Sequence, residues 1–207
     1  MTDDGLQQRF GSIDIYLFDQ LLKGRLFPGM RLLDAGCGSG RNLVYFLGNG
    51  YDVYGTDQSA EAIAQVRRLA SVLAPQLPGD HFRVEPVERM SFTPGFDVVL
   101  SSAVLHFARD EAHWQSMLAE MWRLLEPGGI FFARLASTIG IQDRVTLLEG
   151  RRYHLPDGSD RFLVDEVMLH RVTAELGGEF IEPIKTTVVE NLRAMTTWVV
   201  KKTLTIS

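Results

Sequence analysis

The sequence predicts an α/β protein built on a mostly parallel sheet. Up to residue 135, short apolar runs alternate with segments of helical periodicity. A cluster of glycines directly follows the first of these apolar runs, and two long strand-like runs close the chain. Strands that alternate with helices of this length form βαβ crossovers, in which neighbouring strands run parallel.

The expected elements follow from periodicity, caps and breakers. Apolar residues recur at helical spacing from Ile13 to Leu26, and Pro28-Gly29 then turns the chain. Ser59 and Asp110 are typical helix caps, and Pro127-Gly128-Gly129 predicts a turn. Short apolar or alternating runs predict the strands. We expect helices at 13–26, 39–47, 59–73, 110–126 and 165–176, and strands at 31–35, 51–56, 81–85, 96–101 and 130–135.

The last third of the chain departs from this alternation. Between residues 152 and 164, the turn signal Pro156-Asp157-Gly158-Ser159 separates two short extended runs and predicts a hairpin. Two long runs follow at 180–189 and 192–205. The link between them, around Glu190-Asn191, is too short for a helical crossover, so these two strands must pair antiparallel.

Composition places the chain among single-domain globular proteins. Its 207 residues predict one domain over 1–207, with a helical N-terminal part at 1–29 and the hairpin insertion at 143–165. The contents of 45% apolar and 23% charged residues are ordinary for a soluble protein. The acidic start, residues 1–4, lacks the features of a signal peptide, and no apolar run approaches the ~20 residues of a membrane helix. We therefore expect a cytoplasmic protein without a membrane partner.

Charge and cysteine content exclude several functions. The net charge of −5 disfavours a protein that holds nucleic acid by its phosphates. The single cysteine, Cys37, excludes an internal disulfide framework and an all-cysteine metal site. Histidines and cysteines do not occur at metal-ligand intervals, so we expect no metal. The oligomeric state is left open between monomer and homodimer.

The glycine cluster, Gly36-Cys37-Gly38-Ser39-Gly40, joins the first expected strand to the first crossover. Glycines at this position let the backbone turn sharply and let a ligand approach the main chain. Ligands of open α/β sheets bind just beyond the carboxyl ends of the strands. The spacing is Gly-x-Gly-x-Gly, with Arg41 where a dinucleotide fingerprint has its third glycine, and a Gly-Lys-Ser/Thr phosphate loop is absent from it.

Asp57 ends the second expected strand, beside the glycine cluster. A carboxylate at this position is suited to accept hydrogen bonds from both hydroxyls of an adenosine ribose. The alternative is a local role, in which Asp57 caps the helix that opens at Ser59. Together with the glycines, Asp57 favours an adenosine-containing ligand.

These motifs, with two later ones, resemble the ordered motifs of the class I S-adenosylmethionine-dependent methyltransferases. The later motifs are Phe-Asp-Val-Val-Leu-Ser-Ser at 96–102 and Leu-Glu-Pro-Gly-Gly at 125–129. The resemblance covers roughly residues 30–136. It implies a Rossmann-like three-layer sandwich with a seven-stranded sheet whose last strand is antiparallel. It also implies S-adenosylmethionine as cofactor and S-adenosylhomocysteine as product.

The resemblance assigns cofactor contacts to a defined set of residues. Main chain from Ala35 to Gly38 faces the methionine part, Asp57 takes the ribose hydroxyls and Gln58 flanks the adenine. In many relatives, an Asp after the third strand accepts a hydrogen bond from the adenine amino group. This chain has Pro86 at that position. The Val87 N–H, Glu85 or Glu88 is therefore left to contact the adenine. The expected set is Asp34, Ala35, Gly36, Cys37, Gly38, Gly40, Asp57, Gln58, Val87 and Ser101.

Methyl transfer from a sulfonium is an in-line displacement that depends mainly on alignment, and it needs a base only when the nucleophile must lose a proton. His106, after the fourth strand, is the candidate base, and the alternative is that it packs under the cofactor or caps the next helix. The hairpin, which begins with Arg151-Arg152-Tyr153-His154, is expected to cover the acceptor or to be a solvated loop. The expected acceptor residues are Tyr16, His106, Arg134, Tyr153 and His154.

The sequence therefore predicts a methyltransferase that acts on a small-molecule acceptor. The run Ser101-Ser102-Ala103-Val104 stands where nucleic-acid amino-methyltransferases typically carry Asn/Asp-Pro-Pro-aromatic, which again disfavours nucleic acid. One alternative is a nicotinamide-dependent oxidoreductase, because Asp57 serves either cofactor; the glycine spacing and the lack of a Tyr-x-x-x-Lys pair speak against it. Another is a cofactor-binding protein without catalytic activity.

Overall fold

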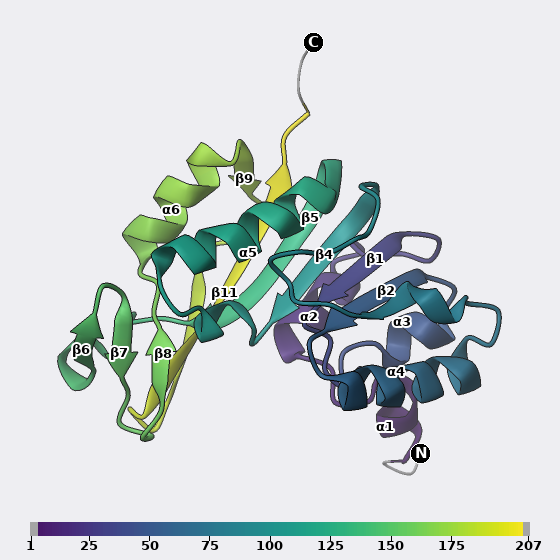
Figure 1. Ribbon diagram of the computed structural model, residues 1–207, viewed down its shortest axis with the longest axis horizontal. Coiled ribbons are helices and arrows are strands. Elements are labelled where there is room, and N and C mark those ends of the chain that lie inside the picture. Colours follow the sequence, from purple (N-terminus) through teal and green to yellow (C-terminus); the bar gives the residue numbers. More distant parts are fainter. Residues whose placement is uncertain (1–3, 205–207) are drawn as a thin grey trace.

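The computed structural model describes residues 4–204, and its helices and strands alternate as expected over the first two thirds of the chain (Figure 1). The helices are α1 (Asp4–Phe10), α2 (Ile15–Leu22), α3 (Val44–Gly48), α4 (Ala60–Leu73), α5 (Glu111–Leu124) and α6 (Glu166–Glu175), with short 3-10 turns η1 (Gly79–His81), η2 (Leu105–Phe107) and η3 (Gln142–Arg144). The strands are β1 (Arg31–Ala35), β2 (Asp52–Asp57), β3 (Phe82–Val84), β4 (Phe96–Ser102), β5 (Leu125–Ala136), β6 (Thr146–Glu149), β7 (Arg152–His154), β8 (Asp160–Phe162), β9 (Gly178–Phe180), β10 (Lys185–Val189) and β11 (Arg193–Lys202).

The main sheet has the order β10-β11-β5-β4-β1-β2-β3, with β9 paired to β11. Strands β1 to β5 pair parallel with one another, whereas β11 is antiparallel to β5, β9 and β10. The prediction of a mostly parallel sheet with an antiparallel last strand is confirmed. The strand order reverses at β1, which lies between β2 and β4, and this reversal is the place where such sheets bind ligands.

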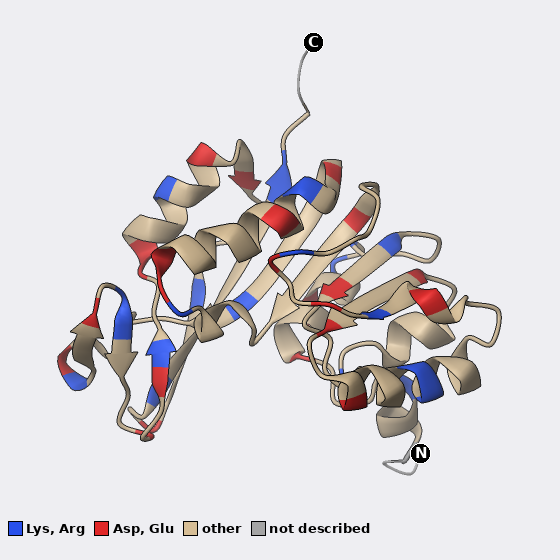
Figure 2. Cartoon of the chain, in the orientation of Figure 1, with Lys and Arg blue, Asp and Glu red and all other residues tan. Residues whose placement is uncertain are grey.

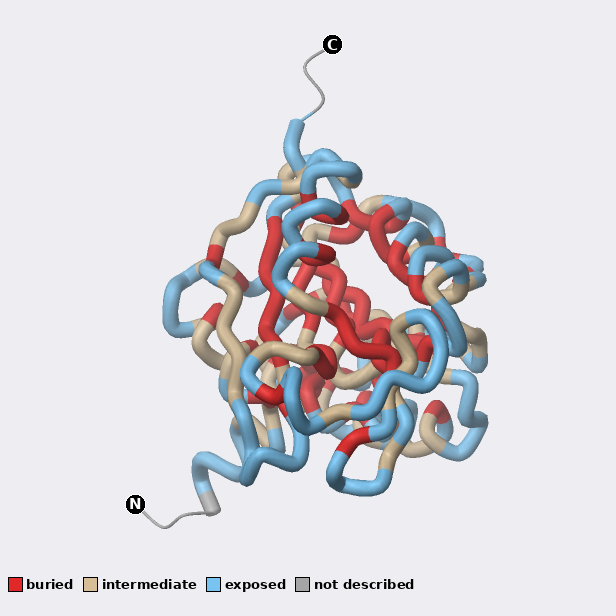
Figure 3. The backbone as a smooth tube through the Cα atoms, turned by 90° about the vertical axis from the view of Figure 1, so that its left-hand side faces the viewer, coloured by how far each residue is buried: buried red, intermediate tan, exposed pale blue. Residues whose placement is uncertain are grey.

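Helices cover both faces of the sheet and make the three layers. Residues of α5 and α6 pack on one face, and residues of α2, α3 and α4 pack on the other. The centre of strand β4 is apolar because it packs on both faces. Phe96 and Val99 belong to the core cluster that includes α5 and α6, while Val98 and Leu100 belong to the one that includes α2, α3 and α4. A parallel strand that is buried on both faces needs such a continuous apolar run. Figure 3 shows this buried centre under an exposed outer layer.

Two elements of the first part differ from expectation. The helix expected at 39–47 begins only at Val44, because Gly40 has φ +86° and the Leu43 N–H donates to the Gly40 carbonyl in a turn. The turn expected at Pro127-Gly128-Gly129 lies inside β5 as an irregularity. Phe96 pairs with Leu125 but Val98 pairs with Ile130, so the residues between them bulge from the ladder.

The C-terminal pair is antiparallel, as its short link requires, but its first strand is broken. The run expected at 180–189 splits into β9 and β10, which accounts for the eighth strand of the sheet. Pro183 lies in the gap, and proline has no N–H to donate to a ladder. The insertion forms a separate three-stranded antiparallel sheet, β6-β7-β8, rather than a simple hairpin. Residues 1–3 of the acidic start and the expected strand end at Thr205 lie outside the described residues.

Within residues 4–204, helices are too short or too polar to cross a bilayer. In the same range, His, Cys, Asp and Glu side chains do not gather in groups of three or more that would hold a metal ion.

Candidate active site

The loop after β1 is shaped by one close approach. Gly36 has φ +81°, and a Cβ added there would lie 2.5 Å from Cγ2 of Val104, in the turn after β4. A side chain at position 36 would therefore clash as well as strain the backbone. The glycine brings the two strand ends together at the reversal point of the sheet.

Asp57, at the end of β2, holds the glycine loop. Its Oδ2 accepts a hydrogen bond from the Gly38 N–H at 3.0 Å, and its Oδ1 accepts one from the Ser59 N–H at 2.9 Å. A carboxylate has about four acceptor sites, so two remain after these bonds. Asp57 thus orders the loop and keeps acceptor capacity for a ligand.

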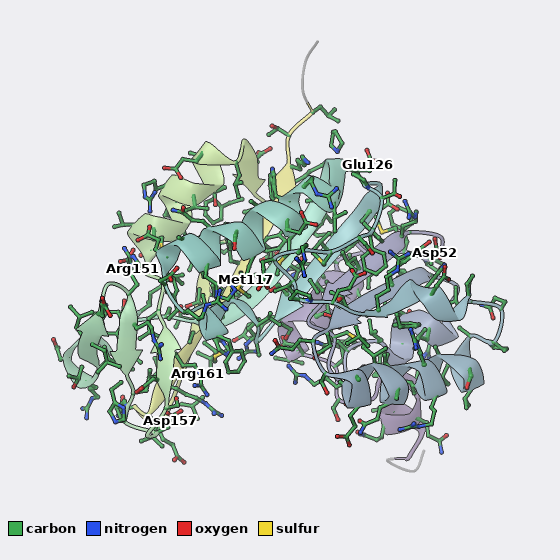
Figure 4. The ribbon with its side chains drawn as sticks, in the orientation of Figure 1. Asp52, Met117, Glu126, Arg151, Asp157 and Arg161 are labelled. Atoms are coloured by element: carbon green, nitrogen blue, oxygen red, sulfur yellow. The ribbon has the colours of Figure 1, made fainter. Side chains whose placement is uncertain are left out.

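Gly36 and Asp57 line a cavity of about 360 Å³. Helix α5 closes it through Met117, which is labelled in Figure 4. The lining residues are Gly36, Asp57, Gln58, Pro86, Val87, Glu88, Ala103, Val104, Phe107, Arg109, His113 and Met117. The cavity combines a glycine cradle, a carboxylate with free acceptor sites and apolar walls, which suits an adenosine-bearing ligand.

The other expected cofactor residues lie behind this cavity. Ala35 is buried at the end of β1, and Cys37 is buried against β2 and Phe82. Gly40 packs against helix α4. Ser101 is fully buried, and its hydroxyl makes no hydrogen bond to the described residues. In this structure these positions support the loop and do not line the cavity.

Asp34 is the most perturbed carboxyl group of this region. It is 1% exposed on β1, and its Oδ2 has no hydrogen-bond partner among the described residues. Burial raises the pKa of Asp34 to about 7, with Asp57 adding to the rise and Arg41 opposing it. A buried acceptor without a partner, directly behind a glycine loop, favours a positively charged group nearby.

Pro86, which stands where many relatives have an Asp, also lines the cavity. Both oxygens of Glu85 are occupied by hydrogen bonds from the N–H and hydroxyl of Ser91. Glu88 instead lines the cavity, with its Oε1 3.3 Å from Nε2 of His113. Of the two glutamates left open by the sequence, Glu88 is the one placed to reach a ligand.

A second cavity of about 380 Å³ adjoins the first, and Ala103 lines both. Ala103 has φ +63°, a left-handed conformation that is strained for a residue with a Cβ, and its N–H donates to the Arg134 carbonyl at 2.7 Å. The lining residues are Asp14, Arg41, Ser102, Ala103, His106, Arg134, Ala136, Leu155, Asp157, Ser159, Arg161, Val189, Arg193 and Met195. We call it the acceptor cavity and the first one the cofactor cavity.

His106 lines the acceptor cavity from η2 and is 7% exposed. Its Nδ1 lies 3.3 Å from the Ala136 N–H and accepts a hydrogen bond from it. A neutral imidazole has one acceptor and one donor nitrogen, so Nε2 carries the proton. Burial, together with the nearby charge of Arg161, lowers the pKa of His106 to about 4. The ring is therefore neutral at physiological pH.

Arg134 and Tyr16, both expected on the acceptor side, contact each other. The Arg134 guanidinium lies 4.8 Å from the centre of the Tyr16 ring and pairs with Oδ2 of Asp14 at 3.1 Å. The Tyr16 hydroxyl hydrogen-bonds Thr187 at 2.7 Å, and its side chain does not line the cavity. Arg134 and His106 are thus brought into the cavity, and Tyr16 stands behind Arg134.

The other expected acceptor residues are not brought there. Tyr153 packs in a small apolar cluster under the insertion, and His154 is half exposed and pairs with Asp160. Figure 4 shows Arg151 at one end of the insertion and Asp157 and Arg161 together at the other. The insertion does reach the cavity, but through residues 155–161.

Sequence reasoning missed most of the charged groups in the acceptor cavity. Arg41, Asp157, Arg161 and Arg193 line it from three separate parts of the chain, the glycine loop, the insertion and β11. Basic positions occur on β7 and β8 of the insertion (Figure 2). The motif Pro156-Asp157-Gly158 predicted a turn. No local pattern in the sequence indicated that the residues beside this turn lie close to β5 and η2.

The strand order, the glycine loop at its reversal and the carboxylate after β2 define the class I S-adenosylmethionine-dependent methyltransferase fold. Among solved structures, the chain is similar to the 1,6-didemethyltoxoflavin-N1-methyltransferase of Burkholderia thailandensis, solved with 1,6-didemethyltoxoflavin and S-adenosylhomocysteine. The TM-score is 0.71 at 21% identity, covering 97% of this chain and 83% of that one. At this identity the likeness shows the fold alone.

Sequence comparison agrees with this class, since residues 33–133 match the family described as a methyltransferase domain. S-adenosylmethionine is the cofactor of this class, which decides against a nicotinamide cofactor. The chain is 33% identical to a malonyl-[acyl-carrier protein] O-methyltransferase of Enterobacter lignolyticus, over 52% of this chain and 39% of that one. It is 30% identical to the tRNA 5-carboxymethoxyuridine methyltransferase of Escherichia coli, over 49% and 38%. These matches span less than half of each relative.

Proposed function

We propose that this protein transfers a methyl group from S-adenosylmethionine to a small molecule bound in the acceptor cavity. The observation that carries this proposal is the junction of the two cavities at Ala103. A donor in one cavity and an acceptor in the other would meet at that junction, and such alignment is the main requirement of in-line displacement.

The residues of the cofactor cavity fit the cofactor. Gly36 lines this cavity, and Asp57 has acceptor sites for the two ribose hydroxyls. We assign the adenine end to the Val87 N–H and to Glu88, which replaces the carboxylate missing at Pro86. When bound, S-adenosylmethionine supplies a methyl group on a positively charged sulfur. Asp34, buried behind the loop, favours positive charge on that side.

The relatives differ in acceptor, one being named for an acyl-carrier protein and another for tRNA. Two properties of this chain favour a small molecule. A volume of about 380 Å³ is within the range of small-ligand pockets. The net charge of −5 opposes a long nucleic-acid backbone.

The test combines binding and transfer. S-adenosylhomocysteine should raise the melting temperature, because a ligand that binds only the native state stabilises it, whereas NADH should leave it unchanged. Methyl-labelled S-adenosylmethionine, incubated with the protein and an extract of the source cells, should label the small-molecule fraction. Binding without any transfer would indicate a catalytically inactive cofactor-binding protein, and label in the RNA fraction would contradict a small-molecule acceptor.

A further inference from the structure

The acceptor cavity carries more positive than negative charge, because only two carboxylates, Asp14 and Asp157, line it. Four arginines line it, and only Arg134 has a carboxylate partner, Asp14. Among residues 4–204, Arg41, Arg161 and Arg193 have no carboxylate oxygen within 4.0 Å. In a chain of net charge −5, three unpaired guanidinium groups around one cavity indicate an anionic occupant.

The insertion and the last strand supply the two arginines best placed for this. Arg161 donates to the Asp160 carbonyl at 2.8 Å and lies over the Phe107 ring at 4.8 Å, so its position is set by the protein. Arg193, at the start of β11, forms no side-chain hydrogen bond to any described residue. A guanidinium offers a fork of donors that matches a carboxylate.

The cavity is poor in groups that would take a proton from an acceptor. The His106 Nδ1 accepts from the Ala136 N–H, which leaves a protonated Nε2. Asp14 is paired with Arg134 and accepts the Tyr16 N–H. Asp157 accepts both the N–H and the hydroxyl of Ser159. Burial alone would raise the pKa of Asp157, but these bonds and the nearby arginines lower it. An acceptor that is already deprotonated fits this set better than an alcohol, a phenol or an ammonium group.

Resting on the proposed function, we propose that the acceptor is a small carboxylic acid and that the enzyme methylates its carboxylate oxygen. A carboxylate is ionised at neutral pH, so no proton has to leave. An arginine can pair with one oxygen while the other attacks. That oxygen forms the new O–CH₃ bond as the methyl–sulfur bond breaks, and the bonding electron pair remains on sulfur. The anion and the sulfonium give a neutral methyl ester and a neutral thioether.

The product's chemistry gives a test that does not require the acceptor to be identified. Methyl esters release methanol in mild alkali, whereas methyl ethers and methylated amines, thiols and carbons do not. Label transferred from methyl-labelled S-adenosylmethionine to the small-molecule fraction of the extract should be released as methanol on alkali treatment. Alkali-stable label would overturn this inference and leave the proposed function standing. Absence of transfer would overturn both.

Variants test the arginines directly. Arg161→Gln and Arg193→Gln should each lower the rate of alkali-labile labelling at limiting extract at least tenfold, while the affinity for S-adenosylhomocysteine stays within twofold of wild type. The matched control is Arg152→Gln, in β7 of the same insertion but outside the cavity lining, which should label at the wild-type rate. Unchanged labelling by both cavity variants would overturn the role of the arginines in holding the acceptor.

Discussion

Asp57 combines a structural and a binding task in one carboxylate. Its oxygens accept the Gly38 and Ser59 N–H groups and keep free acceptor sites toward the cofactor cavity. The alternative that Asp57 caps the following helix is wrong, because Ser59 is the cap of α4 and its side chain accepts the Ala62 N–H. The role of Asp57 as a ribose ligand stays a prediction, for which two of its about four acceptor sites remain.

We predict that Asp57→Ala lowers the affinity for S-adenosylhomocysteine at least tenfold, since charge-assisted hydrogen bonds are worth roughly 1.5–3 kcal/mol each. Isothermal titration measures this loss. The substitution also leaves two N–H groups without their acceptor and should lower the free energy of unfolding by about 1–2 kcal/mol, measured by denaturant titration. A loss of stability with unchanged affinity would mean that Asp57 only orders the loop.

At the scale of elements, the site depends on how closely the β1–α3 loop approaches the turn after β4. Gly36 and Gly38 both have positive φ, but they differ in surroundings. A Cβ at position 36 meets Val104 at 2.5 Å, whereas a Cβ at position 38 meets no described atom within 4 Å. A side chain at position 36 would therefore cause both a steric clash and backbone strain, whereas one at position 38 would cause backbone strain alone.

Gly36→Ala should raise the dissociation constant of S-adenosylhomocysteine at least tenfold, because the loop must move away from Val104, a side chain with little rotamer freedom. Gly38→Ala, the control, should cost only the left-handed backbone strain of about 1 kcal/mol, read as stability. The double variant Gly36→Ala/Val104→Ala should recover part of the affinity. Equal effects of the two single substitutions would contradict a steric role for Gly36.

At the scale of the whole molecule, one buried carboxylate connects the N-terminal helices to the C-terminal strands. Glu182, between β9 and β10, is 7% exposed and pairs with Lys23, Arg25 and Lys185. Burial alone would raise its pKa, but hydrogen bonds from these three cations lower the pKa of Glu182 to about 2. The segment beside Pro183 is held in this way although it leaves the sheet.

Glu182→Gln should lower the free energy of unfolding by on the order of 2 kcal/mol near neutral pH, because three cations lose their shared partner. The folded pKa lies below the ordinary value of 4.5, so the stabilisation is full above that value and disappears as pH falls toward 2. Denaturation at a series of pH values should show the difference from wild type shrinking in that window. Glu179→Gln, at the exposed position of β9, should change stability by less than about 0.5 kcal/mol. A pH-independent difference would contradict the role of the ionised carboxylate.

Local signals in the sequence determined most of the sheet and the position of the cofactor loop. The apolar run of β4 favours burial on both faces, and the glycines after β1 favour a sharp turn. Each of these features depends on residues that are consecutive in the chain, so the sequence alone predicts it. The short link at Glu190-Asn191 was enough to make β10 and β11 antiparallel. Asp57 followed from its place at a strand end beside those glycines.

The acceptor cavity was decided only by the tertiary structure. Its charged residues come from the start of α2, the glycine loop, β5, the insertion and β11, and their spacing along the chain carries no local pattern. The sequence indicated that an insertion was present, but not which of its side chains face the cavity. Alternate residues of a strand point to opposite sides, so His154 and its partner Asp160 lie on the face opposite Arg161. Tyr153 pairs with Arg161 and shares its face, but it packs in the apolar cluster under the insertion, so only Arg161 reaches the cavity.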